Sequence, residues 1–167
     1  MDIETSRLEL NQYLTFTLAS ELFALDIASV REILDNTKIT RIPRTPGFMR
    51  GVINLRGHAV PVVDLRLKFG MSATEMSVNT CIIVTEVLFE GESAVIGALA
   101  DSVQEVVEIQ PQDIDPAPKM GTAIKGKYIK GMGKRNDVFI IILDVDQIFS
   151  AEELSMARSA GVETREE

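Results

Sequence analysis

The chain has 167 residues, of which 46% are hydrophobic and 25% are charged, and its formal net charge is −8. This acidic balance argues against nucleic acid and anionic membrane as partners, because both bind basic surfaces. The longest unbroken apolar run, residues 138–143, falls well short of the roughly 20 residues of a membrane span, and a lone Cys81 cannot form an internal disulfide. No signal peptide is visible at the N-terminus, so we expect a cytoplasmic protein without direct membrane insertion.

Short runs rich in β-branched and aromatic residues, separated by turn residues, predict a mainly β protein. Residues 28–34 fit either a helical turn or a strand, and residues 110–119, which contain three prolines, are expected to be irregular. Ser150 to Glu153 form a capping box that predicts a C-terminal helix over 150–160. The expected strands are 13–18, 22–27, 38–42, 51–55, 58–63, 80–88, 94–99 and 103–109, followed by a hairpin within 131–143.

The stretch from residue 48 to residue 69 predicts a hairpin with Arg56 and Gly57 at its tip, where glycine supplies the positive φ of a tight turn. Pro61 lacks a backbone donor, which places its strand at a sheet edge or a barrel seam. Asp64 follows the hairpin and is expected to cap a short helical turn that ends at Gly70.

This stretch recurs 80 residues later at 128–149, where Gly131, Asp144 and Phe149 fall on Gly51, Asp64 and Phe69. A second, shorter match relates residues 29–33 to residues 102–106 at an offset of 73. Two matches in the same order predict that the chain contains two similar halves.

No catalytic, cofactor or metal site emerges from the sequence. The segment from Gly121 to Lys127 has the spacing of a phosphate loop, but Tyr128 stands where the magnesium-binding hydroxyl belongs and a strand rather than a helix follows. His58 and Cys81 could form a nucleophile pair, although a solvated ring and a buried small hydrophobe are the simpler interpretations. Asp64 and Asp144 are better explained as helix caps than as paired acids.

Arg56 is the most informative single residue. It lies at the tip of an apolar hairpin, and its repeat counterpart is Asn136, so the repeated fold does not require arginine there. A solvated turn residue and an exposed contact for an acidic or helical partner are both consistent with its position.

The hairpin motif closely resembles the signature of the CheW-type chemotaxis coupling proteins. The matching residues are Gly51-Val52-Ile53-Asn54-Leu55-Arg56-Gly57 and Val60-Pro61-Val62-Val63-Asp64-Leu65-Arg66. Further matches occur in the same order at 26–27, 30–33, 40–43, 46–48 and 116–118, so that the resemblance covers residues 12–154. One departure is His58, where aliphatic residues are common in the family.

The resemblance implies two small five-stranded SH3-like β-barrels packed on a shared core, with short helices. We expect a first barrel over 13–70 and a second over 79–149, with room for strands shared between them, and flexible tails at 1–11 and 161–167.

The resemblance also implies a non-enzymatic cytoplasmic adaptor that joins the signalling tip of a chemoreceptor to the regulatory domain of the histidine kinase CheA, in membrane receptor arrays where it can also contact copies of itself. An equivalent coupling protein of a non-flagellar pathway, controlling pili or gene expression, is the alternative. Family members bind the receptor through a groove between the barrels. The matching contact residues are Val30, Glu32, Gly51, Asn54, Arg56, Val103 and Val106.

Overall fold

A computed structural model describes residues 11–35, 37–89, 91–117 and 126–149. Nearly all of its regular structure is β, with only short helical turns between strands, which confirms the mainly β prediction. Within these described ranges no helix is long and apolar enough to cross a membrane. The strands are β1 (Gln12–Leu18), β2 (Glu21–Asp26), β3 (Val30–Asp35), β4 (Met49–Leu55), β5 (His58–Asp64), β6 (Cys81–Phe89), β7 (Glu92–Ala100), β8 (Ser102–Glu108), β9 (Ile114–Asp115), β10 (Ile129–Arg135) and β11 (Val138–Leu143). The helical turns are η1 (Ile27–Ser29), α2 (Leu65–Lys68), η2 (Pro111–Asp113), η3 (Gly126–Tyr128) and α3 (Val145–Ile148).

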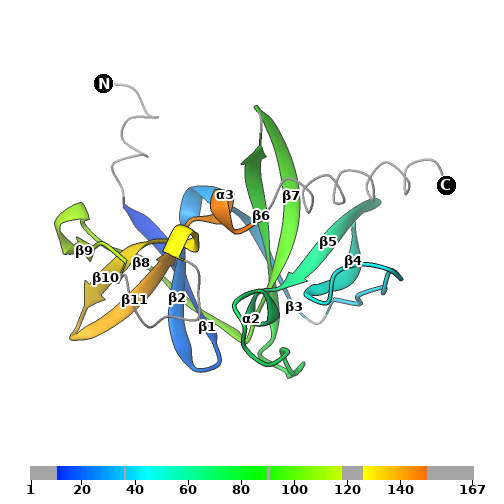
Figure 1. Ribbon diagram of the computed structural model, residues 1–167, viewed down its shortest axis with the longest axis horizontal. Coiled ribbons are helices and arrows are strands. Elements are labelled where there is room, and N and C mark those ends of the chain that lie inside the picture. Colours follow the sequence, from blue (N-terminus) through cyan, green and yellow to red (C-terminus); the bar gives the residue numbers. More distant parts are fainter. Residues whose placement is uncertain (1–10, 36, 90, 118–125, 150–167) are drawn as a thin grey trace.

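The strands form two sheets that lie side by side, with α2 and α3 between them (Figure 1). The six-stranded sheet, which we call sheet A, has the order β8-β1-β2-β11-β10-β9, and the five-stranded sheet B has the order β3-β6-β7-β5-β4. Strand neighbours are antiparallel except at two places, β11 beside β2 and β5 beside β7. The two sheets therefore share one strand order, in which β3 corresponds to β8 and the β4–β5 hairpin to the β10–β11 hairpin.

The internal repeat extends to the details of strand pairing. Both hairpins contain a register shift at the same repeat position, between Met49 and Gly51 and between Ile129 and Gly131. In the parallel contacts Val62 lies opposite Gly97, and Ile142 lies opposite Ala24. These pairs are related by the offsets of 80 and 73 residues, so the structure agrees with both sequence matches.

The division into sheets differs from the sequential ranges 13–70 and 79–149. β1 and β2 join the later strands β8 to β11 in sheet A, whereas β6 and β7 join the earlier strands β3 to β5 in sheet B. Each half thus contributes its first hairpin to the sheet of the other half. Short connections enforce this exchange, because η1 and Asp101 are each too short to return the chain to the sheet it has just left.

The largest hydrophobic cluster lies between the sheets and draws on both of them, as the shared-core prediction requires. Four aromatic rings run through it, with successive centroids 6.1, 6.0 and 5.9 Å apart, in the order Phe16, Phe23, Phe69 and Tyr128. Because Phe69 and Tyr128 flank the two hairpins while Phe16 and Phe23 belong to β1 and β2, this ring series ties the exchanged strands to both halves.

The two capping aspartates are confirmed, but they differ in environment. Asp64 is fully buried and accepts hydrogen bonds from the backbone of Arg66 at 3.1 Å, from Thr74, and from the guanidinium of Arg50 at 2.9 Å. Asp144 is half-buried and accepts a bond from the backbone of Asp146 at 3.2 Å. The first copy therefore contains a buried ion pair that the second copy lacks.

Three predictions about local structure were wrong. Within 38–42 only Thr40 pairs, through an isolated bridge to Val52, since Pro43 and the turn after it end the segment. Residues 110–117 contain η2 and β9 rather than irregular chain. β5 lies between β7 and β4 and is not an edge strand; its contact with β7 begins at Val62, so the missing donor of Pro61 falls just outside that ladder. The predicted helix at 150–160, the tail residues 1–10 and 161–167, and most of the Gly121–Lys127 segment lie outside the described residues.

Candidate functional site

The two end strands β3 and β8 carry the apolar part of the candidate site. Val30 and Val103 both pack against the core cluster that lies between the sheets. Ile33 lies opposite the core residue Ile83, and Val106 lies opposite the core residue Leu14, so both side chains point to the core-facing side of their sheets. Each is nevertheless exposed, Ile33 by 41% and Val106 by 48%. We call these four residues, Val30, Ile33, Val103 and Val106, the inter-sheet surface.

The inter-sheet surface is built from repeat-equivalent residues. An offset of 73 residues relates Val30 to Val103 and Ile33 to Val106. Both members of the outer pair lie on end strands, where no further strand of the same sheet covers them. The repeat thus supplies two similar apolar edges, which are a feature of docking surfaces rather than of a reaction centre.

Cys81 connects the two edges. Its Sγ donates to Oδ1 of Asp35 at 3.3 Å, at the end of β3, and also interacts with the backbone of Val103 at the start of β8. Burial raises the pKa of the Cys81 thiol, and the hydrogen bond to the Asp35 carboxylate raises it further, while the contact with the Val103 backbone partly opposes both. The thiol is therefore a poor nucleophile and fits a packing role.

A polar group surrounds the tip of the first hairpin. Arg56 has a φ of +51° and Gly57 a φ of +87°, as a tight turn requires, and Oδ1 of Asn54 accepts the Gly57 backbone N–H at 2.7 Å. The Arg56 guanidinium donates through both terminal nitrogens to the carboxylate of Glu32 on β3, which raises the pKa of Arg56. We call Glu32, Asn54, Arg56 and Gly57 the hairpin-tip cluster.

The hairpin-tip cluster lies on the opposite face of β3 from the inter-sheet surface. Glu32 is opposite Val84, which belongs to the separate core of sheet B. The Arg56 side chain is 71% exposed, whereas that of Glu32 is only 28% exposed, so the arginine is the accessible member of the pair. Because Arg56 and Glu32 come from opposite ends of the strand order, their ion pair draws the hairpin tip to the edge strand.

Gly51 has a structural explanation. Its φ is +139°, and a Cβ added there would lie 2.1 Å from the carbonyl oxygen of Thr40. That oxygen accepts the Val52 backbone N–H at 2.8 Å, and Thr40 returns a bond to Val52 at 2.8 Å. Glycine at this position allows the segment after β3 to pair with β4.

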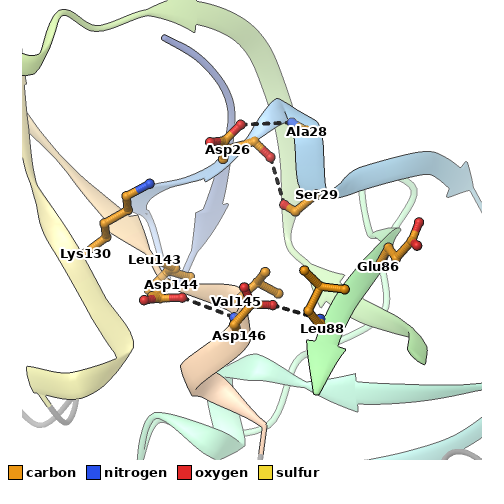
Figure 2. A pocket seen from close by; sticks show the side chains of 10 residues that line it. All are labelled: Asp26, Ala28, Ser29, Glu86, Leu88, Lys130, Leu143, Asp144, Val145 and Asp146. Carbon is orange, nitrogen blue, oxygen red and sulfur yellow. Dashed lines mark hydrogen bonds between the residues drawn. The ribbon is translucent and has the colours of Figure 1, made fainter. Parts of the chain in front are cut away.

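A pocket of about 410 Å³ lies on the side of the molecule where η1 meets α3, and Figure 2 shows the side chains around it. Its lining is mixed, with the carboxylates of Asp26, Glu86 and Asp146 facing the ammonium group of Lys130 and the apolar Leu88. Across the described ranges, no cluster of three or more histidine, cysteine or acidic side chains has the arrangement to hold a metal ion.

The seven predicted contact residues thus divide into three places. Val30, Val103 and Val106 share the inter-sheet surface, Glu32, Asn54 and Arg56 share the hairpin-tip cluster, and Gly51 supports the backbone of β4. Ile33 was not among the predicted contacts, because an apolar residue between Glu32 and Leu34 was taken as core by default. Its repeat relation to Val106 is the signal that identifies it.

Taken together, the fold and the site define a class of protein: a small adaptor with two β-sheets, which presents paired apolar edges and a charged hairpin tip for docking. A family model described as the CheW-like domain matches residues 12–153. The chain belongs to the CheW-like family, whose members are scaffold proteins of chemotaxis and not enzymes.

Individual relatives agree with this assignment over nearly their whole length. The chemotaxis protein CheW of Klebsiella aerogenes is 36% identical over 145 residues, covering 87% of this chain and 85% of that protein. The chemotaxis protein CheW of Helicobacter pylori is 33% identical over 144 residues, covering 86% and 84%. The crystal structure of the scaffolding protein TtCheW from Thermoanaerobacter tengcongensis is similar with a TM-score of 0.77 at 37% identity, over 86% of this chain and 94% of that chain.

Proposed function

We propose that this scaffold protein works in the cytoplasm as a coupling protein, which holds the signalling tip of a helical chemoreceptor and the regulatory domain of the histidine kinase CheA in one complex. Membership of the CheW-like family supports this role. The observation that carries the receptor side of the proposal is the inter-sheet surface, where Ile33 and Val106 remain exposed on two repeat-equivalent edges.

The receptor tip is the partner that the inter-sheet surface suits. A helix with an apolar stripe can bury Ile33 and Val106 together while packing over the half-buried Val30 and Val103. Arg56 adds an exposed cation close to the same edge strand, and its guanidinium can exchange Glu32 for a carboxylate of the partner. Apolar contact would supply affinity and the arginine would supply orientation.

Coupling then follows from two general effects. Binding both partners raises their effective concentration and fixes their relative geometry without any new contact between them. A change in receptor conformation alters kinase activity only if the coupling protein binds one receptor state better than the other. A scaffold with a stiff, shared core suits this task, because movement imposed at one surface is not lost in the linker.

The proposal is tested by sedimenting receptor-containing membranes with the kinase, with and without this protein, while kinase ATP turnover is measured. We expect the kinase to sediment, and its turnover to respond to receptor ligand, only when the protein is present. Val106→Asp should abolish the effect, whereas the matched control Val138→Asp changes an equally exposed valine at the far hairpin tip and should leave it intact. Absence of a ternary complex with the unaltered protein would rule out the coupling role.

A further inference from the structure

The chain crosses between the two sheets at two places that precede the strands of the inter-sheet surface. η1 leads from β2 in sheet A to β3 in sheet B, and Asp101 alone leads from β7 in sheet B to β8 in sheet A. The placement of β8 against sheet B therefore depends on what holds Asp101.

Asp101 receives donors from both sheets. Its Oδ2 accepts the backbone N–H of Ala19, in the β1–β2 turn of sheet A, at 2.7 Å. The same oxygen accepts Nη1 of Arg66 at 3.0 Å, and Arg66 belongs to α2, directly after β5 of sheet B. The Asp101 backbone N–H also donates to the carbonyl oxygen of Thr17 at 2.9 Å. We call the Arg66–Asp101–Ala19 contact the inter-sheet link.

The arginine in this link is held firmly. Its Nε donates to the carbonyl oxygen of Ser72 and its Nη2 to the Ser72 hydroxyl, both at 2.9 Å. The side chains of Arg66 and Asp101 are only 16% and 23% exposed, so solvent and salt screen their ion pair less than they screen the pairs on the surface. A planar guanidinium with three fixed contacts defines a direction as well as an attraction.

The other crossing has no equivalent link. The repeat offsets place Asp146 at the position of Arg66 and Ala28 at the position of Asp101. Ala28 carries no carboxylate, and Asp146 instead accepts the backbone N–H of Leu88 on β6 at 3.0 Å. Both residues line the 410 Å³ pocket (Figure 2). The repeated fold forms at this crossing without an arginine–aspartate link, so the link at Asp101 has a purpose beyond forming the fold.

We propose that Arg66 and Asp101 are positioning residues, which set the placement of β8 against sheet B and so align Val103 and Val106 with Val30 and Ile33. The consequence for receptor binding rests on the proposed function, but the placement of β8 does not. Without the link, Asp101 keeps its contacts to sheet A alone, and β8 moves with sheet A independently of α2 and β5.

The placement can be measured without any partner. Nitroxide labels on Ile33→Cys and Val106→Cys, in a Cys81→Ala background, report the distance between the two edges by electron paramagnetic resonance. We expect one narrow distance population in the parent, a shifted or clearly broader one in Arg66→Met, and a partial return in Arg66→Lys, which keeps the charge but loses the Ser72 contacts. The matched control is Lys134→Met, which removes the 3.3 Å pair with Asp115 inside sheet A and should leave the distance unchanged.

Thermal unfolding of each variant shows whether it is folded, and Asp101→Asn replaces Arg66→Met if the latter does not fold. An unchanged distance population in the folded variant overturns the proposal. Unlabelled variants are then titrated with a soluble fragment of the receptor signalling tip, and we expect Arg66→Met to raise Kd at least tenfold. An altered distance with unchanged Kd would overturn the role in aligning the binding surface. A parent protein that does not bind the fragment would refute the receptor role, while the distance data would still decide the placement of β8.

Discussion

Replacing Gly51 with alanine tests whether this glycine supports the backbone of β4. Its φ of +139° costs about 1–3 kcal/mol for a residue with a side chain. The new Cβ would also lie 2.1 Å from the Thr40 carbonyl oxygen, so the Thr40–Val52 bridge has to open. Losing its two hydrogen bonds costs about 0.5–1.5 kcal/mol each. We therefore expect Gly51→Ala to lower the free energy of unfolding by about 2–6 kcal/mol.

The repeat supplies the control. At Gly131 a Cβ would meet the flexible end of Ile114 at 2.4 Å and the Asp115 carbonyl oxygen at 3.0 Å, and no positive φ is involved. Gly131→Ala should cost only the lower end of the roughly 1–3 kcal/mol that overpacking costs. In a domain of this size Gly51→Ala lowers Tm by about 10 °C. Calorimetry measures both variants, and hydrogen exchange at Val52 shows whether the bridge has opened. Equal losses in the two variants would refute the reasoning.

Three further changes test the polar groups. Arg56→Glu should leave Tm nearly unchanged, because the side chain is largely exposed, yet weaken co-sedimentation with receptor membranes; adding Glu32→Arg restores the ion pair, and recovery of Tm without recovery of binding would show that the partner contacts Arg56 directly. Asp64→Ala should cost about 3–5 kcal/mol in chemical denaturation, since it leaves Arg50 without its buried partner. The control Asp144→Asn should cost less than about 0.5 kcal/mol, because asparagine caps helices as well as aspartate does. Cys81 should react with iodoacetamide at pH 8 several-fold more slowly in the folded than in the unfolded chain, because its raised pKa reduces the thiolate fraction; equal rates would contradict the contact with Asp35.

Sequence patterns predicted the local elements of this fold well. The Arg56–Gly57 turn, the capping role of Asp64 and the second hairpin all follow from residue chemistry within a few positions. Pairing between distant strands was not predictable in the same way. The exchange of hairpins between the halves depends on where the short connections at η1 and Asp101 direct the chain, and no periodicity encodes that direction.

The candidate site was predictable in part for the same reason. Arg56 was recognisable from its own position, because an arginine at an apolar hairpin tip is unusual. Its partner Glu32 became apparent as a partner only in the structure, since β3 and the hairpin tip lie at opposite ends of the strand order. Ile33 resembles any core residue in sequence, and only the edge position of β3 leaves it exposed.

Divergence between the two copies occurs at the polar positions that connect elements, while the apolar positions are kept. The buried pair of Arg50 with Asp64 has Lys130 and Asp144 in its place in the second copy, within the described residues without an ion pair between them. Apolar residues at the two edges can be alike because each only has to pack and dock. Charged side chains act through direction, so changing one of them changes which elements are tied together. A duplicated sheet therefore acquires two distinct sides mainly by exchanging a few charged residues, and the side that carries Arg56 and Arg66 is the one with defined geometry for a partner.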